Sequence, residues 1–203
     1  METVKEYHSA LLYRFARSAV TLFFKMIFRY RVIGQQHVPQ SGAAVICSNH
    51  IHNLDPPVLG LSTTRYVHFM AKDELFRVKP LGWLIYRLGA FPVRRGGQDK
   101  GAIRKALAIP AQGSCLVVFP EGHRSKDGKL GRGMMGASFI ARKANCPIVP
   151  AAIIGTYKIG RRLTVRFGEP IMPEPQDTNE SLMERIMQHI ALLIEQDSRE
   201  QQQ

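Results

Sequence analysis

Two histidines and an aspartate lie within six residues of one another, in a polar loop that follows an apolar run. His50, His52 and Asp55 come directly after the sequence Ala-Val-Ile-Cys-Ser at residues 44–48. A carboxylate hydrogen-bonded to one imidazole nitrogen fixes the tautomer and leaves the other nitrogen free as a general base. On a continuous helix, His50 and Asp55 would point ~140° apart. The pair therefore predicts a general base only if the chain curls between a strand and a helix.

The alternative to a catalytic pair is a capping role. Asp55 precedes Pro56 and Pro57, so its side chain can occupy the N-cap of a helix over residues 56–63 while His50 only fills the loop. The sequence has no serine or cysteine in an elbow such as Gly-x-Ser-x-Gly that would present an enzyme nucleophile. If His50 is a base, it therefore activates a hydroxyl of the substrate itself, and the group is transferred directly.

A pair of arginines ends a second apolar strand. Residues 88–97 run from Leu-Gly-Ala-Phe-Pro-Val into Arg94, Arg95 and two glycines. A guanidinium held at the end of a strand can bind a phosphate through two parallel hydrogen bonds. The alternative is a pair of solvated arginines, so the loop by itself indicates a phosphate site only weakly.

A third loop of the same kind follows residues 115–119. It reads Pro-Glu-Gly-His-Arg-Ser and contains Glu121, Gly122, Arg124 and Ser125. Gly122 permits a backbone turn toward a cleft, Arg124 can bind phosphate, and Glu121 can accept a hydrogen bond from a substrate hydroxyl or orient an arginine. Since functional loops of α/β sheets gather at strand ends, we expect the three loops to converge on one crevice.

The charge of the chain restricts its partners. Its 203 residues include 28 Lys and Arg against 16 Asp and Glu, a formal charge of +12, which attracts nucleic acid, anionic membranes or phosphorylated substrates. Aromatic residues are not interleaved with the basic ones and no nucleic-acid-binding module is recognised, so we expect no nucleic-acid partner. Cys47, Cys115 and Cys146 are an odd number in apolar runs, which indicates buried thiols in a reducing compartment.

Residues 7–30 have the apolar periodicity of one long amphipathic helix whose opposite face carries basic residues. Such a helix can lie in a bilayer interface, and the alternative is that it packs on its own domain. The segment has neither a signal-peptide cleavage site nor an uninterrupted apolar stretch long enough to span a membrane. We therefore expect residues 1–29 to form a membrane-interface anchor.

From residue 30 on, strand and helix patterns alternate. Short runs rich in Val and Ile predict strands at residues 30–34, 43–47, 66–70, 89–93, 115–119, 147–154 and 162–168. Helical periodicity predicts helices over residues 56–63, 80–88, 98–109, 133–144 and 179–197. This alternation predicts one α/β domain over residues 30–197, with a mixed, mostly parallel sheet of about seven strands flanked by helices. Residues 198–203 are expected to be a polar tail.

Four short motifs occur together in a defined order. They are Asn49-His50-x-x-x-x-Asp55, Gly89-x-Phe91-Pro92-Val93-x-Arg95, Phe119-Pro120-Glu121-Gly122-x-Arg124-Ser125 and Ile148-Val149-Pro150. In these motifs the chain resembles the glycerolipid acyltransferase family, and in particular its 1-acylglycerol-3-phosphate (lysophosphatidic acid) acyltransferases, over roughly residues 30–170. Any single motif is modest support, whereas four in order are specific.

The resemblance implies roles for residues in these motifs. His50 would be the general base and Asp55 its orienting partner, while Arg95, Glu121 and Arg124 would hold the glycerol phosphate end of the acceptor, and Gly122 and Ser125 belong to the same substrate-binding motif. As a separate hypothesis about the mechanism, backbone N–H groups near helix 56–63 or in the Glu121–Gly122 turn would stabilise the oxyanion.

The resemblance also implies substrates and a location. A fatty acyl group would pass from acyl-CoA or acyl carrier protein to the sn-2 hydroxyl of 1-acyl-sn-glycerol 3-phosphate, giving phosphatidic acid. No metal and no cofactor would be needed. The reaction would take place at an anionic membrane surface, on the cytoplasmic face of the cell membrane, by a peripheral or monotopic protein.

Three departures from the family pattern leave the acceptor less certain than the reaction. His52 stands where Ser is common, His123 where Thr is common, and Met134 where many relatives carry Lys. His52 is also a rival base. The alternative acceptors are glycerol 3-phosphate or another lysophospholipid, and the alternatives of another class are a non-catalytic anionic-lipid-binding protein and a nucleic-acid-binding protein.

Overall fold

A mixed sheet of seven strands lies at the centre of the computed structural model, which describes residue 18 and residues 21–94 and 99–200. Across the sheet the strand order is β1-β7-β6-β2-β5-β3-β4. The strands are β1 (Arg29–Ile33), β2 (Ala44–Ser48), β3 (Val67–Lys72), β4 (Ala90–Val93), β5 (Cys115–Val118), β6 (Ile148–Gly155) and β7 (Arg162–Phe167). All seven were predicted from the sequence, and their ends differ from the prediction by at most two residues.

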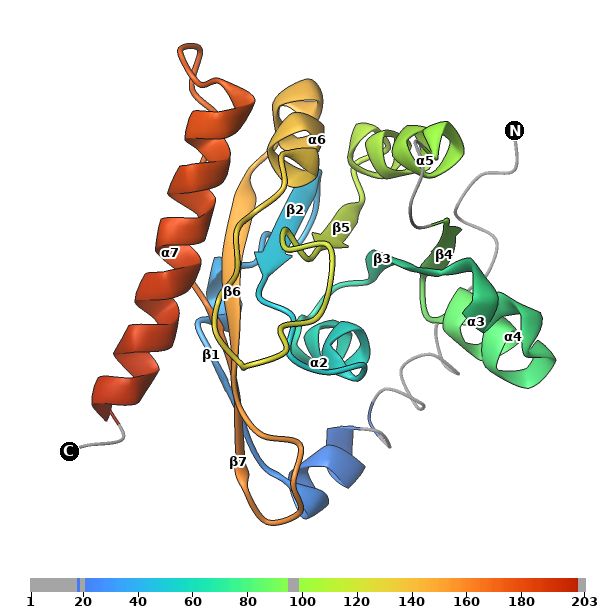
Figure 1. Ribbon diagram of the computed structural model, residues 1–203, viewed down its shortest axis with the longest axis vertical. Helices are drawn as coiled ribbons and strands as arrows, with labels where there is room; N and C mark the ends of the chain where they lie inside the picture. Colours follow the sequence, from blue (N-terminus) through green and yellow to red (C-terminus); the bar gives the residue numbers. More distant parts are fainter. Residues whose placement is uncertain (1–17, 19–20, 95–98, 201–203) are drawn as a thin grey trace.

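Helices cover both faces of this sheet (Figure 1). They are the 3-10 helix η2 (Gln35–His37) and the helices α2 (Asp55–Ser62), α3 (Asp73–Arg77), α4 (Lys79–Arg87), α5 (Lys100–Ala111), α6 (Gly136–Ala144) and α7 (Asn179–Glu200). The five predicted helices between residues 56 and 197 are confirmed, whereas α3 was missed because it is too short to show helical periodicity. Residues 18 and 21–27 are helical as expected, but the helix ends before the predicted residue 30 because β1 begins at Arg29. Residues 7–17, 19 and 20 of the predicted helix lie outside the described residues.

Strands β6, β2, β5, β3 and β4 run parallel to one another, whereas β7 is antiparallel to β6 and parallel to β1. All five residues of the central strand β2 are buried, which explains why four of them, Ala44 to Cys47, are apolar. Its alternate side chains enter two cores. Ile46 packs with residues of α2 and with Phe24, whereas Val45 and Cys47 pack with residues of α5, α6 and α7. The chain is thus a single α/β domain of three layers.

The last helix extends further than expected. It runs to Glu200, beyond residue 197, where the sequence predicted a polar tail to begin. Asp197 is fully buried and pairs with Arg162 at 3.0 Å and with Arg166 at 3.6 Å, both on β7. These ion pairs hold the last turn of α7 against the sheet, which amphipathic periodicity alone does not reveal.

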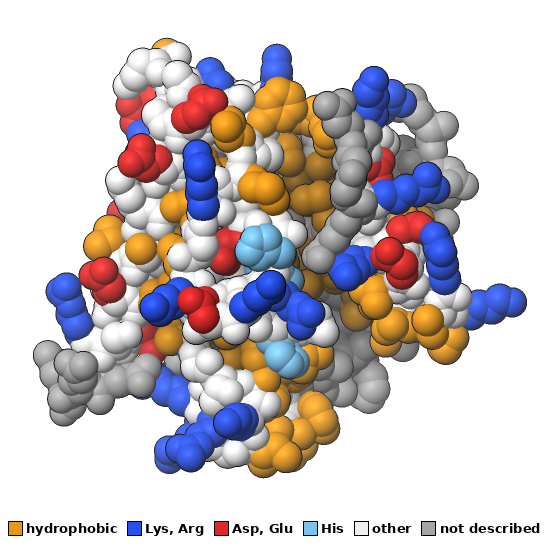
Figure 2. All heavy atoms as spheres, in the orientation of Figure 1, with side chains coloured by type: hydrophobic (Ala, Val, Ile, Leu, Met, Phe, Trp, Pro, Cys, Tyr) orange, Lys and Arg blue, Asp and Glu red, His pale blue; other side chains and the backbone are white. Residues whose placement is uncertain are grey.

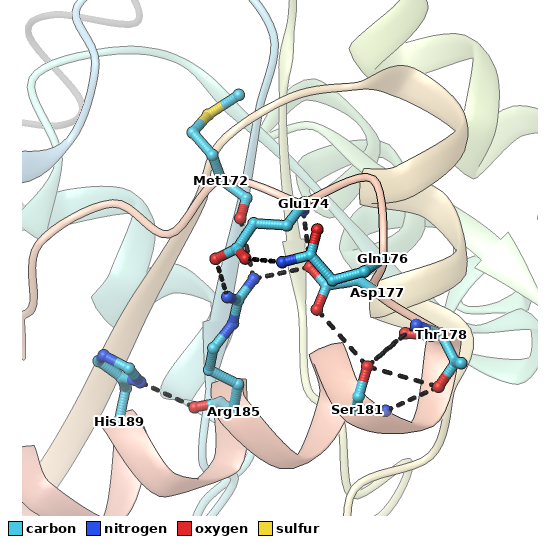
Figure 3. A network of polar contacts seen from close by, with 8 residues as sticks. All are labelled: Met172, Glu174, Gln176, Asp177, Thr178, Ser181, Arg185 and His189. Atoms are coloured by element: carbon cyan, nitrogen blue, oxygen red, sulfur yellow. Dashed lines mark hydrogen bonds and ion pairs between the residues drawn. The ribbon is translucent and has the colours of Figure 1, made fainter.

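The proline-rich connection between β7 and α7 is fastened to the helix by one arginine. Figure 3 shows the Arg185 guanidinium donating to the Met172 carbonyl oxygen at 2.9 Å and to the Asp177 carboxylate at 2.7 Å, with the Glu174 carboxylate as a third partner. Ile171 pairs with Ile148 at the beginning of β6. The network therefore lies at the amino-terminal end of the parallel strands and has a structural role.

The three cysteines are buried and free, as predicted. Burial raises the pKa of the Cys115 thiol to about 12 and that of Cys146 to about 11, and it raises the pKa of Cys47 still further. All three are therefore protonated, unreactive thiols near neutral pH. Among the described residues, no helix is both long and apolar enough to cross a bilayer.

Candidate active site

The loops that follow β2 and β5 meet at the carboxyl-terminal edge of the sheet. These strands are parallel neighbours, so their ends lie side by side. The His50 N–H donates to Oε1 of Glu121 at 3.0 Å, and the Ser125 N–H donates to the His50 carbonyl oxygen at 2.7 Å. The predicted convergence is confirmed for these two loops.

His50 and Asp55 form a hydrogen-bonded pair. Nδ1 of His50 lies 2.7 Å from Oδ2 of Asp55, and the chain between them curls as a loop. The same carboxylate oxygen accepts the N–H groups of Ile51 at 2.6 Å and His52 at 2.7 Å. Asp55 is fully buried, whereas the His50 side chain is 12% exposed. The pair is therefore rigid on the carboxylate side and open to a substrate on the imidazole side.

The predicted N-cap position of Asp55 is wrong. Leu54 occupies the N-cap of α2, and Asp55 is the first residue of the helix. The Asp55 carboxylate turns back to the preceding loop, where it accepts the Ile51 and His52 N–H groups instead of an N–H group of the helix. Its helical position thus serves to aim the carboxylate at His50.

Tyr157 is a member of this cluster that the sequence did not indicate. Its hydroxyl donates to Oδ1 of Asp55 at 2.6 Å. Burial, together with the negative charge of Asp55, raises the pKa of Tyr157 far above its usual range, so the phenol remains a donor. Tyr157 follows β6, and only the observed strand order, which places β6 beside β2, brings it to this edge.

The two histidines differ in their hydrogen bonds. The His50 ring stacks on Phe119 with 4.2 Å between centroids, and among the described residues no partner occupies its Nε2. The His52 ring stacks on Tyr157 at 4.3 Å, and its Nδ1 accepts the Leu54 N–H at 3.3 Å. Only His50 has its ring braced by a carboxylate, so the geometry favours His50 over its rival as the base.

Asn49 fixes the position at which β2 ends. Its side chain is buried, donates to the Ile153 carbonyl oxygen at 2.9 Å and accepts the Ile153 N–H at 2.7 Å. The amide therefore replaces backbone pairing with β6 just before His50. The sequence placed Asn49 in a motif, but its partner on a distant strand could not be read from the residues.

The Glu121 carboxylate joins two segments of backbone. It is 2% exposed, and its two oxygens accept the N–H groups of His50 at 3.0 Å and Gly131 at 2.9 Å. A Cβ at Gly131 would lie 2.9 Å from Oε2 of Glu121, so the close approach requires glycine there. Glu121 thus positions loops instead of orienting an arginine, and its contact with a substrate stays a prediction.

Gly122 adopts the turn that the sequence predicted. Its φ is +68°, in the left-handed region, and a Cβ there would lie 1.8 Å from the terminal methyl carbon of Met134. Met134 thus packs directly over Gly122, at one of the positions that depart from the family pattern. The turn lies next to the buried Glu121 and exposes the residues that follow it.

Three N–H groups in the predicted oxyanion regions donate to backbone carbonyl oxygens in this structure. The N–H of Asp55 donates to His52 and that of Val58 to Leu54, while Pro56 and Pro57 have no N–H. In the second predicted donor region, the Gly122 N–H donates to the Phe119 carbonyl oxygen at 3.0 Å. The role of backbone N–H groups near α2 or in the Glu121–Gly122 turn in stabilising an oxyanion therefore stays a prediction.

Arg124 and Ser125 lie in different environments. Arg124 is exposed, with no ion pair to a described residue. The Ser125 hydroxyl donates to Asp127 at 3.1 Å, as does the Lys129 N–H, and these hydrogen bonds hold the pKa of Asp127 below its usual range. Figure 2 shows Lys and Arg side chains gathered around histidines on this face. Arg124 is available to an anion, whereas Ser125 anchors the loop.

The predicted loop that contains Arg94 and Arg95 is described only at its two ends. Arg95 lies outside the described residues, so its placement stays a prediction. Asp99 caps α5 by accepting the Ala102 N–H at 3.0 Å, and its other oxygen accepts the Arg94 N–H at 3.0 Å. These hydrogen bonds hold the pKa of Asp99 below its usual range. Asp99 thus ties together the segments that flank residues 95–98.

Within residues 21–94 and 99–200, no group of three or more His, Cys, Asp and Glu side chains could hold a metal ion.

Comparisons with known proteins agree with this arrangement. The family model described as Acyltransferase matches residues 29–154. A Bacillus subtilis 1-acyl-sn-glycerol-3-phosphate acyltransferase is 30% identical over an alignment of 168 residues, and the match covers 79% of this chain and 82% of the relative. The Arabidopsis thaliana chloroplastic 1-acyl-sn-glycerol-3-phosphate acyltransferase LPAT1 is 30% identical over 158 residues, and the match covers only 43% of that longer relative.

A solved structure shares the fold. The crystal structure of the 1-acyl-sn-glycerophosphate acyltransferase PlsC from Thermotoga maritima superposes with a TM-score of 0.69 at 26% sequence identity. The match covers 79% of this chain and 68% of the Thermotoga chain. The predicted α/β architecture of this chain is therefore the one seen in that protein.

Proposed function

Because this chain belongs to the Acyltransferase family, we propose that it transfers a fatty acyl group from a thioester to the sn-2 hydroxyl of 1-acyl-sn-glycerol 3-phosphate, giving phosphatidic acid. The observation that carries the proposal is the His50–Asp55 pair, 2.7 Å apart, at the strand edge where the Arg124 loop also lies. The Bacillus and Thermotoga relatives, by their names, support the choice of acceptor.

In this mechanism His50 is the general base. Its Nε2 takes the proton of the sn-2 hydroxyl as that oxygen attacks the thioester carbonyl carbon, while Nδ1 stays bonded to Asp55. The negative charge of Asp55 stabilises the imidazolium, and Tyr157 holds the carboxylate from its other side. When the carbon–sulfur bond breaks, the imidazolium returns the proton to the leaving thiolate. An ester and a free thiol result, with no covalent enzyme intermediate.

The phosphate of the acceptor would be held by arginines. Arg124 is exposed beside the base, and Arg95 would contribute a second guanidinium from the loop tied by Asp99. Guanidinium–phosphate pairs are geometrically specific, so they can orient the glycerol carbons as well as attract the charge. The binding loop would be shaped by Glu121, Gly122 and Ser125. The site would need no metal or cofactor.

The reaction would take place at the cytoplasmic face of the membrane. The acyl chains of the acceptor and of the product lie in the bilayer, and the formal charge of +12 favours an anionic lipid surface. Residues 1–29 would anchor the domain there as a peripheral or monotopic protein. The donor would be acyl-CoA or acyl carrier protein, both of which are water-soluble and reach the site from the same side.

The test is product analysis by thin-layer chromatography. Purified protein is incubated with radiolabelled acyl-CoA and lysophosphatidic acid, in parallel with glycerol 3-phosphate and other lysophospholipids. We expect labelled phosphatidic acid from the wild type, loss of about 10²–10⁴ in rate for His50→Ala, and near-normal rates for the matched control His52→Ala. Full activity in a folded His50→Ala protein would overturn the mechanism, and labelling of another acceptor alone would overturn the substrate.

A further inference from the structure

The hairpin formed by α3 and α4 exposes an unusual amount of apolar surface. Soluble proteins scatter exposed apolar residues singly, whereas a contiguous group marks an interaction site. The exposed fractions are Leu75 40%, Val78 54%, Leu81 38%, Trp83 60%, Leu84 48% and Tyr86 42%. These six side chains fall within 12 consecutive residues and are called the hairpin surface below.

The packing of the hairpin explains why these side chains remain exposed. Gly82 is the buried residue of α4, and a Cβ there would lie 2.5 Å from the Phe76 carbonyl oxygen, so the two helices touch through backbone. Phe76, Ile85 and Leu88 pack against the core. The domain thus uses one narrow face of the hairpin and leaves its other apolar side chains without a described covering layer.

Cationic side chains accompany this apolar surface. The exposed cations are Lys72, Arg77, Lys79 and Arg87, against the carboxylates of Asp73 and Glu74. The Arg87 guanidinium lies over the Trp83 ring, 5.1 Å from its centroid. Leucine and tryptophan side chains flanked by basic residues are typical of helices that lie in the headgroup region of an anionic bilayer.

The hairpin lies beside the end of the sheet that carries the site. It begins directly after β3, whose carboxyl end is at the same edge as that of β4. A cavity of about 300 Å³ between α3 and α5 is lined by Asp73, Arg94, Asp99 and Lys105. Figure 1 shows the hairpin on the side of the sheet opposite to α7, and Figure 2 shows apolar side chains in that region.

We propose that the hairpin surface is a membrane-docking site that places Leu81, Trp83 and Leu84 in the interface of an anionic bilayer. It is separate from the anchor expected in residues 1–29, and it rests on the proposed function in its choice of a lipid surface as partner. Two points of attachment would hold the strand-end loops facing the lipid. An acceptor could then reach His50 without leaving the bilayer completely.

The chain contains one tryptophan, Trp83, which reports on the hairpin directly. The full chain is mixed with phosphatidylcholine vesicles that contain phosphatidylglycerol, with and without bromine on the acyl chains. We expect the Trp83 emission to shift to shorter wavelength and to be quenched by the brominated lipid, and pure phosphatidylcholine to give a weaker effect. In sedimentation, Leu81→Glu with Leu84→Glu should weaken vesicle binding about tenfold.

The matched control is Leu192→Glu. Leu192 is 52% exposed on α7, at the other side of the sheet, so its replacement should leave vesicle binding unchanged. Circular dichroism verifies that each variant is folded. A Trp83 spectrum that does not respond when the protein sediments with vesicles would overturn the proposal, because another segment would then bind. Trp83 emission that is already shifted to shorter wavelength without lipid would mean that residues 1–20 cover the hairpin surface. Emission that changes with protein concentration would mean that a second copy of the chain covers it. Either result would overturn the proposal.

The enzyme is assayed separately in detergent micelles that contain lysophosphatidic acid. There the Leu81→Glu, Leu84→Glu variant should keep the wild-type rate, although its rate on vesicles falls about as much as its vesicle binding. A wild-type protein that is inactive in micelles would refute the proposed function and leave the quenching result standing. The quenching experiment therefore tests membrane docking and the micelle assay tests the proposed function, and each can fail without the other.

Discussion

The Tyr157 hydroxyl donates to Oδ1 of Asp55 across 2.6 Å, while Oδ2 of the same carboxylate lies 2.7 Å from Nδ1 of His50. Three residues from the loops after β2 and β6 and from the start of α2 are thereby joined through one buried carboxylate. Since both oxygens are engaged, the carboxylate cannot rotate away from the imidazole. The arrangement predicts that Tyr157 acts on catalysis through Asp55 without touching the substrate.

Replacing Tyr157 by Phe should therefore lower kcat with little change in KM. The phenyl ring keeps the stacking on His52, so only the hydrogen bond is lost. A hydrogen bond to a charged group corresponds to about tenfold in rate. Without this donor, more of the Asp55 charge faces His50, so the acid limb of the rate–pH profile should move to higher pH. Unchanged kcat and an unchanged profile would show that Tyr157 only fills space.

Removal of the Asp55 side chain should destabilise the whole domain. Asp55→Ala leaves buried N–H and O–H donors at Ile51, His52 and Tyr157 without an acceptor, and we expect a loss of about 3–5 kcal/mol in the free energy of unfolding. Asp55→Asn keeps an acceptor oxygen and should lose activity with a smaller loss of stability. Urea unfolding measures both effects. Equal stability of the Ala variant and the wild type would contradict the observed network.

Gly122 should tolerate no side chain without a loss of function. Gly122→Ala places a residue with a Cβ at φ +68°, which costs about 1–2 kcal/mol, and brings the Cβ into the Met134 methyl. The matched control is Gly113→Ala, where φ is +74° but nothing lies within 4 Å.

Both glycine variants should lose stability by a similar amount from the backbone, and only Gly122→Ala should also lose activity, because its turn adjoins Glu121. Adding Met134→Ala to Gly122→Ala removes the contact but not the backbone strain. Full recovery of stability in that double variant would refute the backbone explanation. Thermal unfolding and the acyl-transfer assay separate the two contributions.

Arg124 should contribute to acceptor binding more than to fold. Arg124→Gln removes an exposed guanidinium beside the base, and we expect the KM for lysophosphatidic acid to rise about tenfold, with a weaker salt dependence. Arg142→Gln is the matched control, since Arg142 bonds Asn179 near the far end of α6. If both variants raise KM equally, the effect is one of net charge and not of a phosphate site.

Asp99 should stabilise the protein at neutral pH and not in acid. Its hydrogen bonds with the Arg94 and Ala102 N–H groups lower the pKa of its carboxyl group in the folded state. The contribution of Asp99 to the free energy of unfolding is therefore complete above the unfolded-state pKa of its carboxyl group. This contribution is lost as the pH falls through the lower folded-state pKa. The melting temperature of Asp99→Ala should lie below that of the wild type at neutral pH, and the two should converge in acid.

The control for this titration is Glu180→Ala, which replaces an exposed first-turn acid of α7 and should give a smaller difference at every pH. If Asp99 also holds the loop of residues 95–98, its replacement should raise the KM for the acceptor as well. A gap in melting temperature that widens toward acid pH would contradict the assigned sign.

The sequence by itself predicted the strands, most of the helices and the pairing of His50 with Asp55. These features depend on contacts between residues that are close in the chain, so periodicity, prolines and short motifs encode them locally. The N-cap position of Asp55 was wrong because a short carboxylate can turn either forward or backward, and only the packed loop decides which.

Tertiary structure alone decided which loops share the site. β6 lies beside β2 although 99 residues separate their adjacent ends, and this non-local pairing brings Tyr157 to Asp55 and Ile153 to Asn49. The same holds for Glu121, whose carboxylate accepts backbone N–H groups of two distant segments. Such contacts depend on the order of strands in the sheet, which is set by the free energy of the whole packed core and leaves no periodic trace in the residues.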